Sequence, residues 1–456
     1  MGNYAGRGKG SLVSSPRLLA LAMLDRWKET DLDWDRHLDA CSSKDRALVR
    51  QLVSGTLRMQ GKIDYYLGLF LRQRLSALPQ RVRNILRMAV FQLKFCDRIP
   101  DYAIVYDSVE FTKNIYQGSY GPLVNGVLRN LIRKWDNVTL PSAEIDSLSF
   151  LTVNYSHPEW LVKRYLDRFG FHFTQSLLEA NNIQAPLVLR LEEACGKKTS
   201  EGSVLRRKIE EGGLEVREGR FLPEALVVTG AGLPRASLLP GYSEGLFYVQ
   251  DEAAMLVAHL AAPVPGSLIF DFCAAPGGKS THLARLAGKD SLVVASDLNR
   301  KRLEKLNENI QRLGLNNLRL LVCDARLPAT LGAGLVLCDV PCTGTGVLRR
   351  KPELRWRIKQ KDLAGLTELQ REILEAGADA CAPGGTLVYS TCSLEPEENW
   401  GIVSSFLAGR DDFHLDPADK YLKNELVSGE GCLATFPNVH GIDGAFAARL
   451  VRKPAA

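Results

Sequence analysis

The chain has 456 residues, of which 45% are hydrophobic and 24% are charged, so it can build two to four domains with ordinary cores. No apolar run reaches the roughly 20 residues that a membrane-spanning helix needs. The N-terminal stretch contains glycines and cations but no apolar segment of the kind found in secretion signals. These features argue against a membrane or exported protein and predict a cytoplasmic one.

The formal net charge of +6 is unevenly distributed along the chain. Residues 1–140 contain 22 Lys and Arg against 13 Asp and Glu, a net charge of +9, so the remainder is close to neutral. A basic N-terminal third predicts a polyanionic partner such as a nucleic acid. The simpler alternative is a set of helices with solvated basic faces.

Ten cysteines are spread over the chain, and none forms a CxxC pair. This spacing argues against a zinc ribbon or a thioredoxin-type motif. We therefore predict reduced thiols, most of them small buried side chains, and no metal site.

Four segments differ in pattern. The Gly- and Ser-rich residues 1–16 predict a disordered N-terminus. Apolar residues at three- and four-residue spacing, interrupted by Pro79, Pro100 and Pro122, predict an all-α bundle over 17–140. Helical and extended runs alternate over 150–244 and predict a small α+β module. Strand–loop–helix repeats over 245–453 predict a doubly wound, mostly parallel sheet with an antiparallel C-terminal strand.

A small-residue loop joins the first strand of this last segment to its helix, in DFCAAPGGKS at 271–280. Such a loop lets a ligand approach the backbone and the N-terminus of the following helix. Cys273 stands where a P-loop needs glycine, and GxGxxG is absent, so neither nucleotide motif matches. A tight structural turn is the competing interpretation.

Three aspartates, Asp297, Asp324 and Asp339, end the next three predicted strands. An acid at such a position can accept hydrogen bonds from ribose hydroxyls, although each could instead cap a turn or a helix. Acidic strand ends favour a neutral or cationic nucleoside over a phosphorylated one. S-adenosylmethionine fits that description.

Two cysteines, Cys342 in DVPCTGTG and Cys392 in STCSLEPEEN, each follow an apolar strand. A thiolate that adds to carbon 6 of a pyrimidine makes carbon 5 nucleophilic enough to accept a methyl group, and a helper group then assists its release. These two cysteines can provide both functions, and the pattern alone does not assign them. The alternative is two small residues at strand ends.

The chain resembles the RsmB/Sun/Fmu-type members of the NOL/NOP/Sun RNA cytosine-5 methyltransferase family, and the resemblance covers nearly the whole chain. It rests on six motifs that occur in this order: DFCAAPGGK, SD, CDA, DVPCTGTG, STCSLEPEEN and DGAFAARLVRK. It implies a NusB-like RNA-binding bundle and a Rossmann-like class I methyltransferase domain. It also implies that Cys392 is the nucleophile and that Cys342 assists product release. The implied S-adenosylmethionine contacts are Cys273, Ala274, Ala275, Pro276, Gly277, Gly278, Lys279, Asp297, Asp324 and Asp339. Asp339 and Lys279 are also expected to act on the reacting base.

The resemblance therefore predicts an enzyme that methylates carbon 5 of a cytosine in small-subunit (16S) ribosomal RNA. Its substrate is expected to be deproteinised or early-assembly RNA, and the protein is expected to act as a monomer. A transfer-RNA methyltransferase and a non-catalytic RNA-binding or ribosome assembly factor are the alternatives. A Rossmann oxidoreductase is disfavoured because GxGxxG is absent.

Overall fold

The structure is a computed structural model that describes residues 15–27, 42–97, 99–192, 200–230, 233–327 and 332–455. The predicted disordered segment 1–16 lies outside these ranges except for its last two residues. The chain divides into two compact units, one formed by residues 1–182 with 351–357 and the other by 183–350 with 358–456. No helix in the described ranges is both long and apolar enough to cross a membrane.

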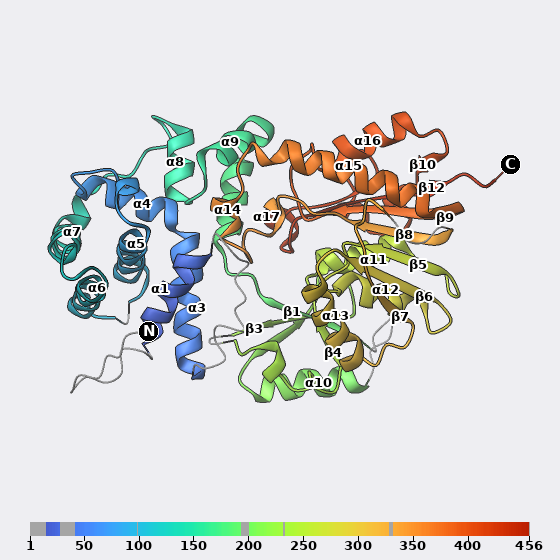
Figure 1. Cartoon of the computed structure of the whole chain (residues 1–456), viewed down its shortest axis with the longest axis horizontal. Helices are drawn as coiled ribbons and strands as arrows, with labels where there is room; N and C mark the ends of the chain where they lie inside the picture. Colours follow the sequence, from blue (N-terminus) through green and yellow to red (C-terminus); the bar gives the residue numbers. More distant parts are fainter. Residues whose placement is uncertain are drawn as a thin grey trace. The chain divides into compact units, whose positions relative to one another are not determined.

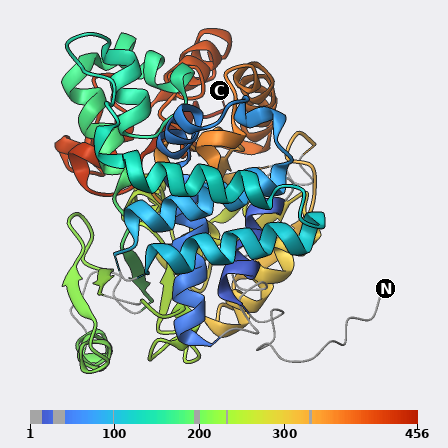
Figure 2. The ribbon, with the colours of Figure 1, turned by 90° about the vertical axis from the view of Figure 1, so that its left-hand side faces the viewer.

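The first unit is helical, as the periodicity predicts. Its blue-to-teal helices lie alongside one another in Figure 2 and share one apolar core. Pro79 and Pro100 directly precede two helices, and Pro122 lies in the first turn of a third, where the missing N–H is not needed. The main helices are α1 (Pro16–Arg26), α3 (Ser43–Arg58), α4 (Gln60–Phe70), α5 (Gln80–Phe95), α6 (Asp101–Tyr116) and α7 (Gly121–Lys134), with short 3₁₀ turns η2 (Leu75–Ala77) and η3 (Trp135–Asn137).

Two further helices, α8 (Ser147–Asn154) and α9 (Glu159–Asn182), follow in this unit. Gly170 has a non-helical backbone with φ 74° and divides α9 into two helical pieces. The short helix α14 (Leu354–Arg357) also belongs here. Its Arg355 is fully buried and donates hydrogen bonds to Asn182 and to the Asn181 carbonyl, so a segment distant in sequence helps to build the helical unit.

The second unit begins with a small sheet of strand order β2-β3-β1-β4. Its elements are β1 (Leu187–Leu191), α10 (Ser200–Glu211), β2 (Glu215–Glu218), β3 (Ala225–Thr229), η4 (Ala236–Leu238) and β4 (Phe247–Val249). Strand β4 pairs antiparallel with β1, so this sheet extends past the boundary predicted at residue 244. The three-residue length of β4 explains why the sequence pattern does not reveal it.

The larger sheet has the order β10-β12-β9-β8-β5-β6-β7, with β11 paired to β12 (Figure 1). Strands β5 to β9 run parallel, and β12 is antiparallel to β9, as predicted. The strands are β5 (Leu268–Phe272), β6 (Leu292–Asp297), β7 (Leu318–Val322), β8 (Ala333–Asp339), β9 (Cys381–Thr391), β10 (Phe413–Leu415), β11 (Leu433–Thr435) and β12 (Ala445–Arg452). The helices and turns are α11 (Glu252–Ala261), α12 (Gly278–Ala287), α13 (Arg300–Arg312), η5 (Thr345–Val347), α15 (Asp362–Ala380), α16 (Trp400–Gly409), η6 (Ala418–Lys420), η7 (Asn424–Leu426) and α17 (Pro437–His440).

Both faces of this sheet are covered, which is why its central strands are almost continuously apolar. Alternate side chains point to opposite faces: Ile269 joins a core with α11, α12 and α13, whereas Phe270 and Phe272 join a second core with α15 and α16. The strand order reverses between β5 and β8. Open α/β sheets bind ligands beyond the carboxyl ends of their strands at this kind of position.

Candidate functional site

Three loops meet at the carboxyl edge of the large sheet, after β5, β8 and β9. Strand β8 lies between β5 and β9 in parallel register, with Asp339 opposite Ser390. The turn after β8 carries Cys342, and the turn after β9 carries Cys392. Because the three strands are adjacent and parallel, the predicted chemical groups converge on one edge.

The two cysteine sulfurs lie 3.3 Å apart, within hydrogen-bonding distance. All eight cysteines in the described part of the chain, including these two, are free of disulfides. The hydrogen bond to Cys392, together with burial, raises the pKa of Cys342 well above its ordinary value. Cys342 therefore keeps its proton at neutral pH and can donate a hydrogen bond to the Cys392 sulfur.

A lysine–aspartate pair lies at the same edge. Lys279 Nζ is 2.7 Å from an Asp339 carboxylate oxygen, which also accepts a hydrogen bond of 2.8 Å from the Ser390 hydroxyl. Burial by itself favours the neutral amine. The Asp339 carboxylate outweighs that effect and, with a smaller contribution from Cys392, raises the pKa of Lys279. Lys279 is therefore a stable cation whose charge acts on Asp339 and on the Cys392 sulfur.

A buried glutamate that the motif analysis did not single out connects the two cysteine loops. The Glu398 carboxylate accepts the Thr343 backbone N–H at 2.9 Å and the hydroxyls of Thr343 and Ser393. Gln370 of α15 adds a fourth donor at 2.9 Å. Thr343 and Ser393 each follow one of the cysteines, so Glu398 ties the positions of both thiols together. The sequence does contain a signal for such an acceptor: a hydroxyl residue follows each cysteine, and a buried hydroxyl needs a hydrogen-bond partner.

The small-residue loop after β5 is tightly held. Asp297 accepts the backbone N–H groups of Ala275 and Asn299, at 3.2 and 2.8 Å, and the Ala274 N–H donates to the Ser296 carbonyl at 2.8 Å. Gly277 has φ 104°, and a Cβ there would overlap Leu306, so only glycine suits this position. The conformation of this loop is therefore fixed by its own contacts, and the loop brings the N-terminus of α12 to the edge of the sheet.

The electrostatic environment of the loop is acidic. Burial raises the pKa of Asp271 to about 7, and its Oδ2 accepts a hydrogen bond of 2.5 Å from Ser280. Burial, reinforced by Asp339, Asp297 and Asp271, raises the pKa of Cys273 to about 12. A negative potential at the loop suits a cationic ligand better than a phosphate.

The three predicted acids occupy different positions. Asp297 ends β6 and Asp339 ends β8, as predicted, whereas β7 ends at Val322, two residues before Asp324. Asp324 forms a 2.7 Å ion pair with Arg326, and hydrogen bonds from this arginine lower the pKa of Asp324 to about 2. Asp324 thus has a local partner, unlike a carboxylate directed only at a ligand. Of the other predicted contacts, Pro276 lies in the loop after β5, and Gly278 is the first residue of α12.

Comparisons with known proteins agree along the length of the chain. Residues 258–451 match the family model described as 16S rRNA methyltransferase RsmB/F, residues 14–133 match the NusB family, and residues 157–233 match the RsmF/B-like ferredoxin-like domain. The probable ribosomal RNA small subunit methyltransferase B of Synechocystis is 34% identical over 453 residues, covering 96% of this chain and 99% of the relative. The Bacillus subtilis protein of the same description is 32% identical, covering 90% and 92%.

Solved structures agree at the level of the fold. The crystal structure of PH0851 superposes with a TM-score of 0.81 at 26% identity and covers 97% of this chain and all of its own. The crystal structure of NSun6 from Pyrococcus horikoshii, which contains SFG, an S-adenosylmethionine analogue, has a TM-score of 0.57 at 24% identity. It covers 66% of this chain and 99% of its own.

Proposed function

The chain belongs to the RsmB/F family of 16S ribosomal RNA methyltransferases, and from this membership we propose that it methylates carbon 5 of a cytosine in small-subunit ribosomal RNA. The observation that carries the proposal is the pair of sulfurs 3.3 Å apart, at the ends of β8 and β9 and beside the Lys279–Asp339 ion pair. We further propose that it acts in the cytoplasm as a monomer.

The cofactor is S-adenosylmethionine, which supplies the methyl group as a sulfonium. The acidic environment that raises the pKa of Cys273 is compatible with this positive charge. We propose that the cofactor is held by residues 273–279 together with Asp297, Asp324 and Asp339. Gly277 lets the loop pack closely against α13, because a Cβ there would overlap Leu306. Asp297 holds the loop by accepting a hydrogen bond from the Ala275 backbone N–H.

In the proposed reaction, the Cys392 thiolate adds to carbon 6 of the cytosine and forms an S–C6 bond. The electrons of the C5–C6 double bond shift toward carbon 5, which becomes nucleophilic and forms a bond to the methyl carbon of the donor. The bond from that methyl carbon to the donor sulfur breaks, and its electron pair stays on the sulfur, which would leave as a neutral thioether. The carbon 5 proton then passes to a water molecule. Its bonding electrons restore the double bond as the S–C6 bond breaks and the Cys392 thiolate leaves.

The surroundings of the two thiols support this division of roles. Cys342 holds its proton, so it can donate a hydrogen bond to the Cys392 sulfur and stabilise it as a leaving group. Lys279 provides the positive charge that favours a thiolate at Cys392. Asp339, oriented by Lys279 and Ser390, is the proposed acceptor for the cytosine amino group.

Methyl transfer to purified RNA tests the function. The wild-type protein, given labelled S-adenosylmethionine and deproteinised small-subunit RNA, is expected to label a cytosine that bisulfite sequencing then locates, and Cys392→Ala is expected to abolish the label. No label on any cytosine of this RNA would overturn the proposal. If transfer RNA is labelled instead, the same reaction takes place on the alternative substrate, and the ribosomal RNA assignment is wrong.

Trapping the covalent adduct tests the roles of the two cysteines. Cys342→Ala is expected to accumulate a protein–RNA adduct that survives denaturing electrophoresis, because attack proceeds while release stalls. Neither Cys392→Ala nor the Cys342→Ala/Cys392→Ala double variant is expected to form this adduct. An adduct found only with Cys392→Ala would reverse the assignment.

A further inference from the structure

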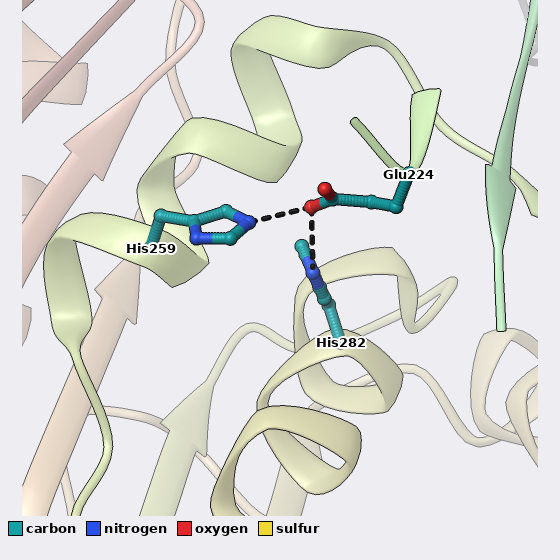
Figure 3. A group of neighbouring side chains, drawn as sticks. All are labelled: Glu224, His259 and His282. Atoms are coloured by element: carbon teal, nitrogen blue, oxygen red, sulfur yellow. Dashed lines mark hydrogen bonds and ion pairs between the residues drawn. The ribbon is translucent and has the colours of Figure 1, made fainter. Parts of the chain in front are cut away.

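A second cluster of potential ligand side chains lies outside the methyl-transfer site. Glu224 precedes β3 in the small module, His259 lies in the last turn of α11, and His282 lies in α12. Figure 3 shows both imidazole rings directed at the same carboxylate oxygen. The His259 Nε2 atom is 2.5 Å from Glu224 Oε1, and the His282 Nε2 atom is 3.6 Å from it.

The imidazole of His282 is buried and has no hydrogen-bond partner among the residues that the structure describes. Its residue is 1% exposed, and neither ring nitrogen makes a hydrogen bond within the described residues. Buried polar atoms in proteins nearly always have a partner, so an unpaired buried imidazole calls for an explanation. One ring nitrogen of a neutral imidazole has a lone pair that a metal ion can accept. A neutral imidazole is the form that binds metals.

We propose that Glu224, His259 and His282 bind a divalent transition metal of the zinc type. One donor atom from each residue lies within 4.8 Å of the other two. Donor atoms about 2.0–2.1 Å from a tetrahedral zinc ion are separated by about 3.4 Å. Binding would replace the short His259–Glu224 hydrogen bond with two metal bonds and would give the unpaired His282 nitrogen a partner.

The surroundings provide charge balance and access. The Glu224 side chain is 3% exposed and supplies a negative charge, while the nearby Arg190 is paired with Glu192 at 2.6 Å. The His259 side chain is 30% exposed, so an ion can enter from solvent and a water molecule can complete the coordination. Two imidazoles, one carboxylate and a water form a familiar zinc donor set.

The proposed ion would link the small module to the helix that begins at the cofactor loop. Its three ligands come from three separate elements, and His282 lies one turn after Lys279. We therefore assign it a stabilising role rather than a catalytic one. Cysteine spacing, on which the prediction of no metal site is based, gives no information about a site made of two histidines and a glutamate.

Metal binding by the full-length protein tests this proposal. Chelator-treated protein is dialysed against zinc or cobalt, and bound metal is measured by mass spectrometry. A Cys342→Ser/Cys392→Ser background removes the sulfur pair as a competing site. One metal per chain is expected in this background, with at least tenfold weaker binding after His282→Ala or Glu224→Gln. His414→Ala, which changes an exposed histidine on β10, is expected to bind as before.

Bound cobalt gives a second readout that does not depend on stoichiometry. Nitrogen and oxygen ligands produce visible d–d absorption without the near-ultraviolet thiolate band that cysteine ligands add. Glu224→Gln preserves side-chain size, so it separates the loss of a ligand from a failure to fold. Absence of stoichiometric binding, or binding that persists after both His282→Ala and Glu224→Gln, would overturn the proposal.

Discussion

The sulfurs of Cys342 and Cys392 are 3.3 Å apart, yet their surroundings differ. The pKa of Cys342 is raised well above its ordinary value, and Lys279 carries a positive charge that acts on Cys392. Such differences arise from a few neighbouring side chains rather than from the cysteines themselves. Two further carboxyl groups at this edge of the sheet, those of Glu398 and Asp271, are also buried. Glu398 accepts hydrogen bonds from both cysteine loops, and the pKa of Asp271 is raised by burial.

Glu398→Gln is expected to lower the rate of methyl transfer at least tenfold. The amide places an N–H group where the carboxylate accepted donors, so at least one charge-assisted hydrogen bond of about 1.5–3 kcal/mol is lost and the cysteine loops shift. Single-turnover kinetics measures the effect, with S-adenosylmethionine affinity as the companion readout. Glu397→Gln, the same change at an exposed neighbour, is the control. Equal rates in the two variants would contradict a positioning role.

Asp271→Asn is expected to stabilise the protein increasingly as pH rises from about 4 to about 7. Burial raises the folded-state pKa of Asp271 from 3.8 to about 7. Between these values the folded state holds a proton that the unfolded state has released, so wild-type stability falls as pH rises, by up to roughly 4 kcal/mol. Asparagine does not titrate and can still accept the Ser280 hydrogen bond.

Urea denaturation at pH 4.5 and pH 7.5 measures this difference. The variant and the wild type are expected to be similar in stability at the lower pH, with the variant more stable at the higher one. A stability difference that is the same at both pH values would contradict a raised pKa at Asp271.

At the scale of elements, the contact between α15 and β8 positions the turn that carries Cys342. Gly377 of α15 packs against Cys338 and Leu387, and a Cβ at this glycine would overlap the Cys338 sulfur. Helix α15 also supplies Gln370 to the Glu398 carboxylate. The close packing of α15 against β8 therefore helps to hold the loops that carry Cys342 and Cys392 in place.

Gly377→Ala is expected to destabilise the fold by about 1–3 kcal/mol, because the added methyl group forces α15 away from the sheet. Gly365→Ala in the same helix is a matched control with open space around its Cβ position. It is expected to stabilise the fold by up to about 1 kcal/mol, since alanine favours a helix over glycine. Thermal denaturation distinguishes the two, and the same sign for both changes would contradict this account.

At the scale of the whole molecule, the charge distribution separates a basic N-terminal third from a near-neutral remainder. Some of the arginines in this basic part of the chain form ion pairs within the helical unit. Arg81 pairs with Asp25 at 2.9 Å, and Arg87 pairs with Asp64 at 2.7 Å. Arg129 and Arg133 on α7 are exposed, so they are the better candidates for contacts with RNA.

Arg129→Glu/Arg133→Glu is therefore expected to weaken RNA binding. It is also expected to reduce the slope of log affinity against log salt concentration by the share that about one to two phosphate contacts contribute. Binding measured by fluorescence anisotropy across several salt concentrations gives both quantities. Lys289→Glu/Lys453→Glu makes the same change in charge at exposed positions near the amino edge of the sheet. Equal losses in the two variants would indicate a general charge effect rather than an RNA-binding face.

Local sequence was sufficient for much of the fold. Apolar spacing predicts the helical bundle, and alternating strands and helices predict the parallel sheet with its antiparallel C-terminal strand. Parallel βα units bring the carboxyl ends of their strands to one edge, so the loops carrying Cys273, Cys342 and Cys392 could be placed together from the sequence. The short strand β4 and the helices α11, α14 and α16 were not predicted, because short or continuously apolar segments lack a clear period.

Contacts between side chains from distant segments needed the tertiary structure. The chain itself determined which residues stand at the sheet edge, because periodicity and strand order are local properties. Only packing brings Glu398 to the hydroxyls of both cysteine loops and directs His259 and His282 at Glu224. Those contacts depend on how helices lie against the sheet, which is decided by the volumes of many side chains together rather than by the spacing of any one motif.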